Sequence, residues 1–168
     1  RHYCFLMRYR KKQRSIILIL RILPSLLTGV LWEKKREEWL SPVEGVITSA
    51  CGERVNPILG KRENHNGLDI AVAEGTAVIA VKSGKVTEVR TSATYGKLLE
   101  YETTDGYTVM YAHLSKVLVQ EGEMVKQGQK VAESGNTGLS TGPHLHYSLW
   151  KGEKLLDPMD YLSAENMV

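Results

Sequence analysis

The residues of this chain that could do chemistry are histidines gathered in three short segments. Four of the five histidines lie there: His65 stands four positions before Asp69, His113 stands alone, and His144 and His146 form a His-x-His pair. Imidazole and carboxylate groups are metal ligands and also proton donors and acceptors near neutral pH. The chemistry to consider is therefore metal-assisted or general acid–base hydrolysis.

The His-x-His pair predicts two neighbouring imidazoles. In a strand, residues i and i+2 point to the same face, so His144 and His146 would lie side by side with Leu145 on the opposite face. Two charged imidazoles would repel each other there, whereas a metal cation favours their neutral form. Taken alone, the pair is also compatible with two surface or core histidines.

The spacing of His65 and Asp69 would place both on one face of a helix, but the local sequence favours a loop that enters a strand. Gly67 lies between them and the apolar residues 70–72 follow. Glycine lets the chain bend, so that both side chains can meet one ion. Two imidazoles and one carboxylate form a common zinc set with a fourth position for water. This motif, too, is weak when taken alone.

The elements that must position these residues are predicted to be short strands. Runs rich in β-branched and aromatic residues alternate with glycine turns, a pattern typical of an antiparallel β-sandwich or barrel. Asp105 and Gly106 mark the clearest hairpin. The predicted strands with the strongest patterns are 76–81, 85–91, 97–103, 107–113 and 143–150.

The N-terminal region has a different composition. Residues 15–32 are mostly apolar and follow a basic run at 8–14, which predicts a single transmembrane anchor whose basic flank stays in the cytoplasm. Arg21 and Pro24 oppose this interpretation, and an interfacial helix or a cleaved signal remain alternatives. The expected organisation is a basic N-terminus at 1–14, an anchor at 15–32, a charged linker at 33–41 and a globular domain at 42–168.

Composition and charge narrow the function classes. Hydrophobic residues make up 42% and charged residues 24% of the 168 residues, so a packed core is feasible. Seven of the 22 Lys and Arg residues lie within residues 1–32, which hold no acidic residue, and the remainder is net acidic. Nucleic-acid binding by the folded part is therefore not expected. Cys4 and Cys51 form neither a metal motif nor a disulfide framework.

The three histidine motifs together resemble peptidase family M23, the lysostaphin/LytM-type zinc endopeptidases. The resemblance rests on the segments 65–71, 111–115 and 138–147, and it extends in family order over about residues 42–162. It implies an all-β fold, an antiparallel sandwich or barrel-like LytM domain of the duplicated-hybrid-motif type, placed here after the N-terminal transmembrane helix.

The same resemblance implies roles for five residues. His65, Asp69 and His146 match the ligands of one zinc ion per chain, and His113 and His144 match the two catalytic histidines, with their individual roles left open. The implied activity is hydrolysis of peptide bonds in peptidoglycan stems or cross-bridges by zinc-activated water. The domain would lie outside a bacterial cell membrane, held by its single-pass anchor.

An alternative from a different class also follows from the resemblance. Some membrane-anchored M23-like proteins, such as a stage IV sporulation factor, act as regulatory modules that bind a partner without cleaving it. This chain would then bind another extracytoplasmic membrane protein or the cell wall. The sequence leaves the roles of three residues open. Arg54 could belong to the site or form a structural ion pair, and Tyr111 and Tyr147 could line the groove or pack within the sheet. Trp39 is interpreted as a membrane-interface or helix-face residue.

Overall fold

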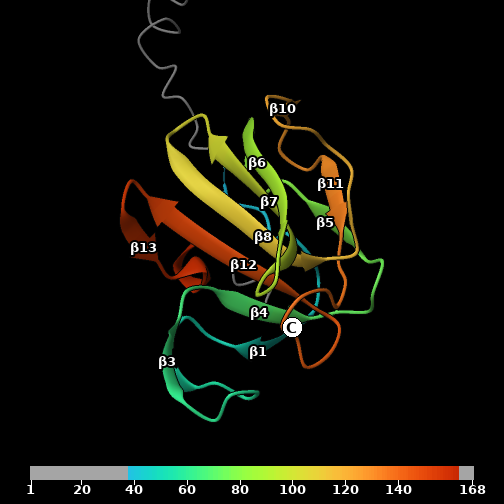
Figure 1. Ribbon diagram of the computed structural model, residues 1–168. Coiled ribbons are helices and arrows are strands. Elements are labelled where there is room, and N and C mark those ends of the chain that lie inside the picture. The colour runs from blue at the N-terminus through green and yellow to red at the C-terminus, as the bar shows by residue number, and fades with distance from the viewer. Residues whose placement is uncertain (1–37, 163–168) are drawn as a thin grey trace, which may run out of the picture. The chain divides into compact units, whose positions relative to one another are not determined.

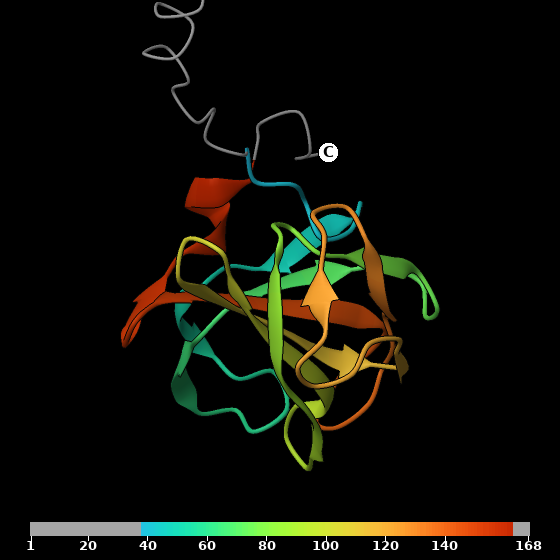
Figure 2. The ribbon, with the colours of Figure 1, turned by 90° about the horizontal axis from the view of Figure 1, so that it is seen from above.

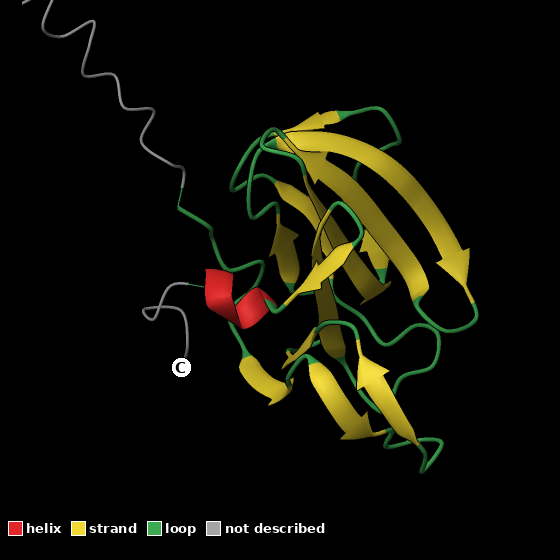
Figure 3. Cartoon of the chain, turned by 90° about the vertical axis from the view of Figure 1, so that its left-hand side faces the viewer, coloured by secondary structure: helices red, strands yellow, loops and turns green. Residues whose placement is uncertain are grey.

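The computed structural model describes residues 38–162, which form strands and one short helical turn (Figure 3). No helix within this range is long and apolar enough to cross a membrane. The elements are β1 (Val46–Ser49), β2 (Gly52–Val55), β3 (Arg62–His65), β4 (Leu68–Ala71), β5 (Ala77–Ile79), β6 (Gly84–Ser92), β7 (Gly96–Thr103), β8 (Tyr107–Leu114), β9 (Lys116–Val117), β10 (Met124–Val125), β11 (Lys130–Glu133), β12 (His144–Lys151), β13 (Lys154–Leu156) and the 3-10 helix η1 (Pro158–Tyr161).

The largest sheet carries most of the chemistry-bearing residues. Its strand order is β1-β4-β12-β8-β7-β6-β10, with β13 paired to β12, and every pairing is antiparallel (Figure 1). A second sheet has the order β5-β11-β9, and its strands β5 and β11 lie beside the long strands in Figures 1 and 2. The expected all-β antiparallel fold is confirmed, whereas the expected N-terminal helix lies outside the described residues.

The core draws apolar side chains from both sheets. Leu145, Tyr147 and Leu149 alternate along one face of β12 and are fully buried, together with Val78 of β5 and Val131 of β11. The intervening residues of β12 therefore project from the opposite face of the large sheet. This alternation separates a packed face from a face that carries histidines.

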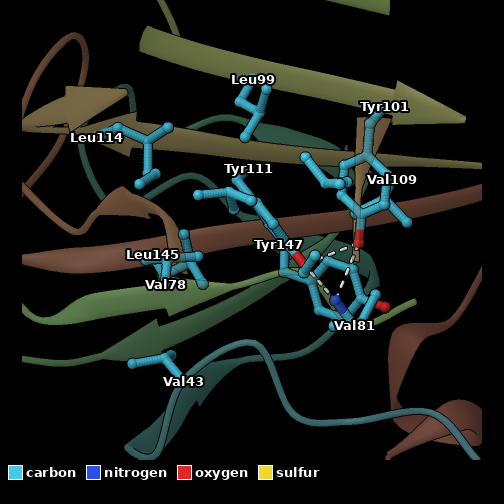
Figure 4. Packing of buried hydrophobic residues seen from close by; sticks show 14 of the residues in the cluster. Val43, Val78, Val81, Leu99, Tyr101, Val109, Tyr111, Leu114, Leu145 and Tyr147 are labelled. Atoms are coloured by element: carbon cyan, nitrogen blue, oxygen red, sulfur yellow. Dashed lines mark hydrogen bonds between the residues drawn. The ribbon is translucent and has the colours of Figure 1, made fainter. Parts of the chain in front are cut away.

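Three buried tyrosines form the polar centre of this core (Figure 4). The Tyr101 hydroxyl accepts a hydrogen bond from the Val81 amide at 3.0 Å, and the Tyr111 hydroxyl donates to the Ile79 carbonyl at 3.0 Å. Tyr147 packs beside Tyr111, with 5.7 Å between ring centroids. Tyr111 and Tyr147 are thus core aromatics of the sheet and do not line a groove.

A two-stranded hairpin forms its own small sheet beside the large one. Strands β2 and β3 pair from Gly52 opposite His65 to Val55 opposite Arg62. We call residues 52–65 the arm. The arm ends at His65, so its geometry decides where that histidine lies.

The folded domain already includes residues 38–41, which sequence patterning assigned to the linker. Trp39 packs edge-on against Tyr107 and Tyr161, at 5.1 Å between centroids in each case, and Lys82 Nζ lies 4.8 Å from its ring centre. Trp39, interpreted from the sequence as a membrane-interface or helix-face residue, lies outside the helical turn of the domain and completes an aromatic cluster there. The expected segments 1–14 and 15–32, and linker residues 33–37, lie outside the described residues.

Candidate active site

Three predicted ligands converge at one end of the large sheet. Asp69 on β4 lies directly opposite His146 on β12 in the strand register, and His65 arrives from the end of the arm. Asp69 Oδ1 is 2.8 Å from His146 Nδ1 and 3.2 Å from His65 Nε2, and the two histidine nitrogens are 3.2 Å apart. All three side chains are largely buried.

This donor triangle fits a zinc ion. Zinc bonds to imidazole nitrogen and carboxylate oxygen are about 2.0–2.2 Å long, which places the donors of a tetrahedral site roughly 3.3 Å apart. The three donor atoms lie within 4.8 Å of one another and are chemically of the type that zinc prefers. The fourth position of such a site would be left for water or substrate.

Each of these donors is oriented by a further contact. The Nδ1 of His65 lies 2.9 Å from the Ala50 carbonyl, which only accepts, so Nδ1 carries the proton and Nε2 faces Asp69. The Nε2 of His146 lies 2.9 Å from the buried Ser148 hydroxyl. Such outer contacts fix the ring orientation of metal-binding histidines.

Gly67 lies in the turn that joins β3, which ends at His65, to β4, which carries Asp69. This turn packs closely against β12. A Cβ atom at this position would lie 2.6 Å from the Tyr147 carbonyl oxygen and 2.8 Å from the His146 ring. A side chain there would push the β3–β4 turn away from β12. Gly67 thus brings His65 and Asp69 to the same point, as the sequence motif suggested.

His113 reaches the site through a β-bulge. Lys97 pairs with Leu114 and Leu99 pairs with Tyr111, so β8 carries one extra residue at this point. Among residues 38–162, His113 is the one non-glycine residue with positive φ, at 60°. Regular alternation would put His113 on the core face with Tyr111. The bulge instead turns His113 toward the site and lets Leu114 enter the core.

The two predicted catalytic histidines lie beside the donor triangle. Their ring centroids are 4.6 Å apart, and His144 Nε2 is 3.8 Å from Asp69 Oδ1. The Nδ1 of His113 lies 2.7 Å from the Thr137 carbonyl, and the Nδ1 of His144 lies 2.8 Å from the Gly142 carbonyl. Both Nδ1 atoms therefore donate, and each neutral ring keeps Nε2 as a proton acceptor.

Burial and contacts within the cluster shift the pKa values of His113, His146 and Asp69. Burial lowers the pKa of His113 to about 4, against the raising effect of the hydrogen bond to Thr137. Burial also lowers the pKa of His146. For Asp69, burial acts to raise the pKa, but its contacts with the His146 and His65 rings outweigh burial, and the carboxyl pKa lies well below its usual range. Neutral imidazoles and an ionised carboxylate are the forms that bind a cation.

A groove of about 260 Å³ exposes these groups to solvent. The arm lines it with Pro57 and Ile58, the β6–β7 turn with Tyr95, and the segment before β12 with Leu139 and Ser140. The five predicted site residues all line this groove as well.

Sequence reasoning missed two side chains that shape the site. Tyr95 lies over His146, at 5.6 Å between ring centroids, and its hydroxyl accepts a hydrogen bond from Asn66. It belongs to a turn far from the three motifs, and no local pattern marks it. Ser148 follows His146 by two positions, so strand alternation would have placed it on the same face.

Arg54, which the sequence left open, reaches the site as part of an ion-pair network. Its guanidinium contacts Asp69 Oδ2 at 2.8 Å and Glu63 Oε1 at 2.8 Å. It therefore contacts a predicted metal ligand directly and also joins the two strands of the arm.

Known proteins share both the sequence and the fold of this domain. A sequence model of Peptidase family M23 matches residues 63–158. The Vibrio cholerae peptidoglycan DD-endopeptidase ShyB is 40% identical over 114 residues, 67% of this chain and 27% of that protein. An uncharacterized metalloprotease of Buchnera aphidicola is 36% identical over 115 residues, 68% of this chain and 31% of that protein. The chain thus spans less than a third of the length of these two relatives.

Solved structures of peptidases are similar to this domain in both fold and sequence. A zinc containing peptidase from Vibrio cholerae superposes with a TM-score of 0.66 at 37% identity, over 73% of this chain and 38% of that chain. The catalytic domain of lysostaphin from Staphylococcus simulans superposes with a TM-score of 0.62 at 35% identity, over 68% of this chain and 90% of that chain. The family pattern covers more than half of the sequence, and the fold agrees with it, so the chain belongs to peptidase family M23.

Proposed function

We propose that this protein is a zinc-dependent endopeptidase that hydrolyses peptide bonds in peptidoglycan stems or cross-bridges. The observation that carries the proposal is the triangle of His65 Nε2, Asp69 Oδ1 and His146 Nδ1 beside two histidines that both keep Nε2 as an acceptor. The relative ShyB is named a peptidoglycan DD-endopeptidase, so cross-linked stem peptides are the first substrates to test.

In this proposal His65, Asp69 and His146 hold one zinc ion per chain. When bound, zinc lowers the pKa of water toward neutrality and polarises the carbonyl of the peptide bond. The low pKa of His113 keeps its ring neutral at physiological pH. Its Nε2 can therefore take a proton from the attacking water rather than repel the cation.

The second histidine completes the proton transfers. His144 Nε2 lies 3.8 Å from Asp69 Oδ1. After His144 takes over the proton that His113 removed from water, its Nε2 can donate a hydrogen bond to the oxygen on which negative charge develops. The proton taken from water must finally reach the amine of the leaving peptide, and either ring can deliver it because the two face each other. The carbonyls of Thr137 and Gly142 hold both rings in the required orientation.

The test is digestion of purified peptidoglycan sacculi by the purified full chain, followed by mass spectrometry of the released peptides. The proposal predicts new amine and carboxyl ends at a stem or cross-bridge bond, and loss of this release in His144→Ala. A zinc-loaded chain that releases nothing from any wall preparation would contradict it. That outcome would favour the alternative of an M23-like module that binds a partner or the wall without cleavage.

We further propose that residues 15–32 anchor the protein in the bacterial cell membrane with the peptidase domain on the outer side. The support is the apolar run and its basic flank in the sequence. Protease added to intact spheroplasts should then degrade the domain while the membrane fraction retains the N-terminal segment. A domain that is protected until the cells are lysed would contradict this orientation.

A further inference from the structure

The Arg54 side chain links three groups at the back of the metal-ligand triangle. Its Nη1 donates to Asp69 Oδ2 at 2.8 Å and to the Ser49 hydroxyl at 2.7 Å, and its Nε donates to Glu63 Oε1 at 2.8 Å. Asp69 thus uses its two oxygens differently. Oδ1 faces the histidines and Oδ2 faces Arg54.

We propose that Arg54 is a positioning residue that makes Asp69 a one-oxygen metal ligand and ties the arm to the metal centre. This inference rests on the proposed function, because it assigns Arg54 a role toward the zinc ion. It adds a residue outside the three histidine motifs to the machinery of the site.

The physical reason lies in the coordination chemistry of carboxylates. A carboxylate binds a metal through one oxygen or through both, and a second oxygen would occupy part of the position that a hydrolytic zinc site leaves open. The guanidinium competes for Oδ2 through a charge-assisted hydrogen bond. Its planar fork can also hold Glu63 at the same time, which the compact ammonium of a lysine could not do equally well.

The same guanidinium connects the metal centre to one wall of the groove. Glu63 is held from its other oxygen by Asn56 Nδ2 at 2.7 Å. The Asn56 side-chain oxygen in turn accepts from the amides of Ile58 and Leu59 at 2.9 and 2.8 Å. The tip of the arm, which lines the groove with Ile58, is therefore linked by hydrogen bonds to Asp69.

A purely structural ion pair would also explain these contacts, so a loss of stability cannot decide the question. The coordination of a bound metal ion can distinguish the two roles of Arg54. If Arg54 only holds the arm, its removal should leave the ligand set of a bound ion unchanged. If Arg54 restrains Asp69, its removal frees Oδ2 for the metal and changes both the affinity and the coordination number.

The experiment uses the purified full chain with zinc removed. Zinc affinity is measured by competition with a chromogenic chelator, and coordination by the visible absorption of the Co²⁺-substituted protein, which is stronger for four than for five or six ligands. Arg54→Gln is the main variant. Arg54→Lys, which keeps the charge, is measured in parallel, so that the test survives if the glutamine variant does not fold.

Two further variants separate the alternatives. Glu63→Gln weakens the ion pair between β2 and β3 within the arm but leaves the contact between Arg54 and Asp69. Arg90→Gln removes an exposed arginine of β6 that pairs with Glu88 at 2.9 Å and serves as the matched control. Neither substitution touches Asp69, so both should keep the wild-type cobalt spectrum.

We expect Arg54→Gln to weaken zinc binding by about 10- to 100-fold, the usual range for outer-shell partners, and to reduce the cobalt absorption. Arg54→Lys should also lower the zinc affinity and the cobalt absorption, but by less. Unchanged affinity, an unchanged spectrum, or an equal change in Glu63→Gln would overturn the proposal. These readouts do not involve hydrolysis. A wild-type chain that binds cobalt but cuts nothing refutes the proposed function alone. A wild-type chain that binds no metal refutes the proposed function and the role of Arg54 together.

Discussion

Asp69 and His146 face each other across adjacent antiparallel strands, and Asp69 Oδ1 lies 2.8 Å from His146 Nδ1. Backbone pairing of β4 with β12 therefore sets the separation of two of the three proposed ligands. The third, His65, depends on the arm and on the turn at Gly67. Strand pairing therefore places two of the ligands, whereas the third is placed by the arm and its hydrogen bonds to Asp69.

Replacing His113 by alanine should separate chemistry from metal binding. A histidine that transfers protons typically contributes about 10²- to 10⁴-fold to the rate, so kcat should fall within this range. The zinc content should stay at the wild-type value, because the His113 Nδ1 hydrogen bond points to Thr137 and the residue is not one of the three donors. Elemental analysis together with peptide-release rates would check this. Zinc loss in parallel with activity would contradict the assignment.

The strained backbone at His113 predicts an unusual order of stabilities. At φ 60°, glycine is relaxed whereas alanine keeps the strain, so His113→Gly should be more stable than His113→Ala by about 1 kcal/mol. Both variants lack the imidazole, so urea unfolding compares the backbone alone. The control is Ala112→Gly on the same strand, where glycine should be destabilising. A glycine variant at 113 that is less stable than the alanine variant would refute the strain.

The buried position of His113 predicts an acid-sensitive domain. Its pKa of about 4 lies below the value near 6.5 of an exposed histidine, so the unfolded chain binds more protons between these two pH values. The contribution of His113 to stability is therefore complete above about pH 6.5 and is lost as the pH falls toward 4. NMR titration of the metal-free protein would give the pKa directly. A value at or above 6.5 would show that the ring is solvated.

The hydrogen bond between His146 Nε2 and Ser148 predicts an effect on metal affinity. Ser148→Ala removes the partner that orients this ring, and zinc should bind about 10- to 100-fold more weakly. Thr108→Ala, on the neighbouring strand β8 and opposite Trp150, makes a control in the same sheet. Chelator competition on both variants measures the difference. Equal affinities would mean that strand pairing alone orients His146.

The sequence predicted the long strands well, and the five residues it singled out lie together in the structure, for physical reasons. Strands 97–103 and 107–113 were bounded by glycine turns and match β7 and β8 closely, because apolar alternation and turn chemistry are local signals. The short strands β9, β10 and β13 were not distinguished. Each has two or three residues, too few to carry a period, and each forms only against a partner strand.

The geometry within the site was less predictable than its composition. Regular alternation would have buried His113 in the core, and only the register shift between β7 and β8 reveals the bulge that turns it outward. Tyr95 enters through packing between segments far apart in the sequence. Gly96 and Gly138, both with positive φ, allow the β6–β7 turn and the loop before β12 to touch through their backbones. Such contacts depend on tertiary structure.

The most direct test of the central claim is a zinc titration of activity on one defined substrate. The metal-free chain is mixed with increasing zinc and a purified cross-linked muropeptide dimer, and cleavage is followed by mass spectrometry. We predict that cleavage is absent without metal, rises linearly and reaches its plateau at one zinc per chain, with no response in His146→Ala. Cleavage that persists without metal, or none at one bound zinc per chain, would contradict the assignment of His65, Asp69 and His146 as the ligands of a catalytic zinc ion.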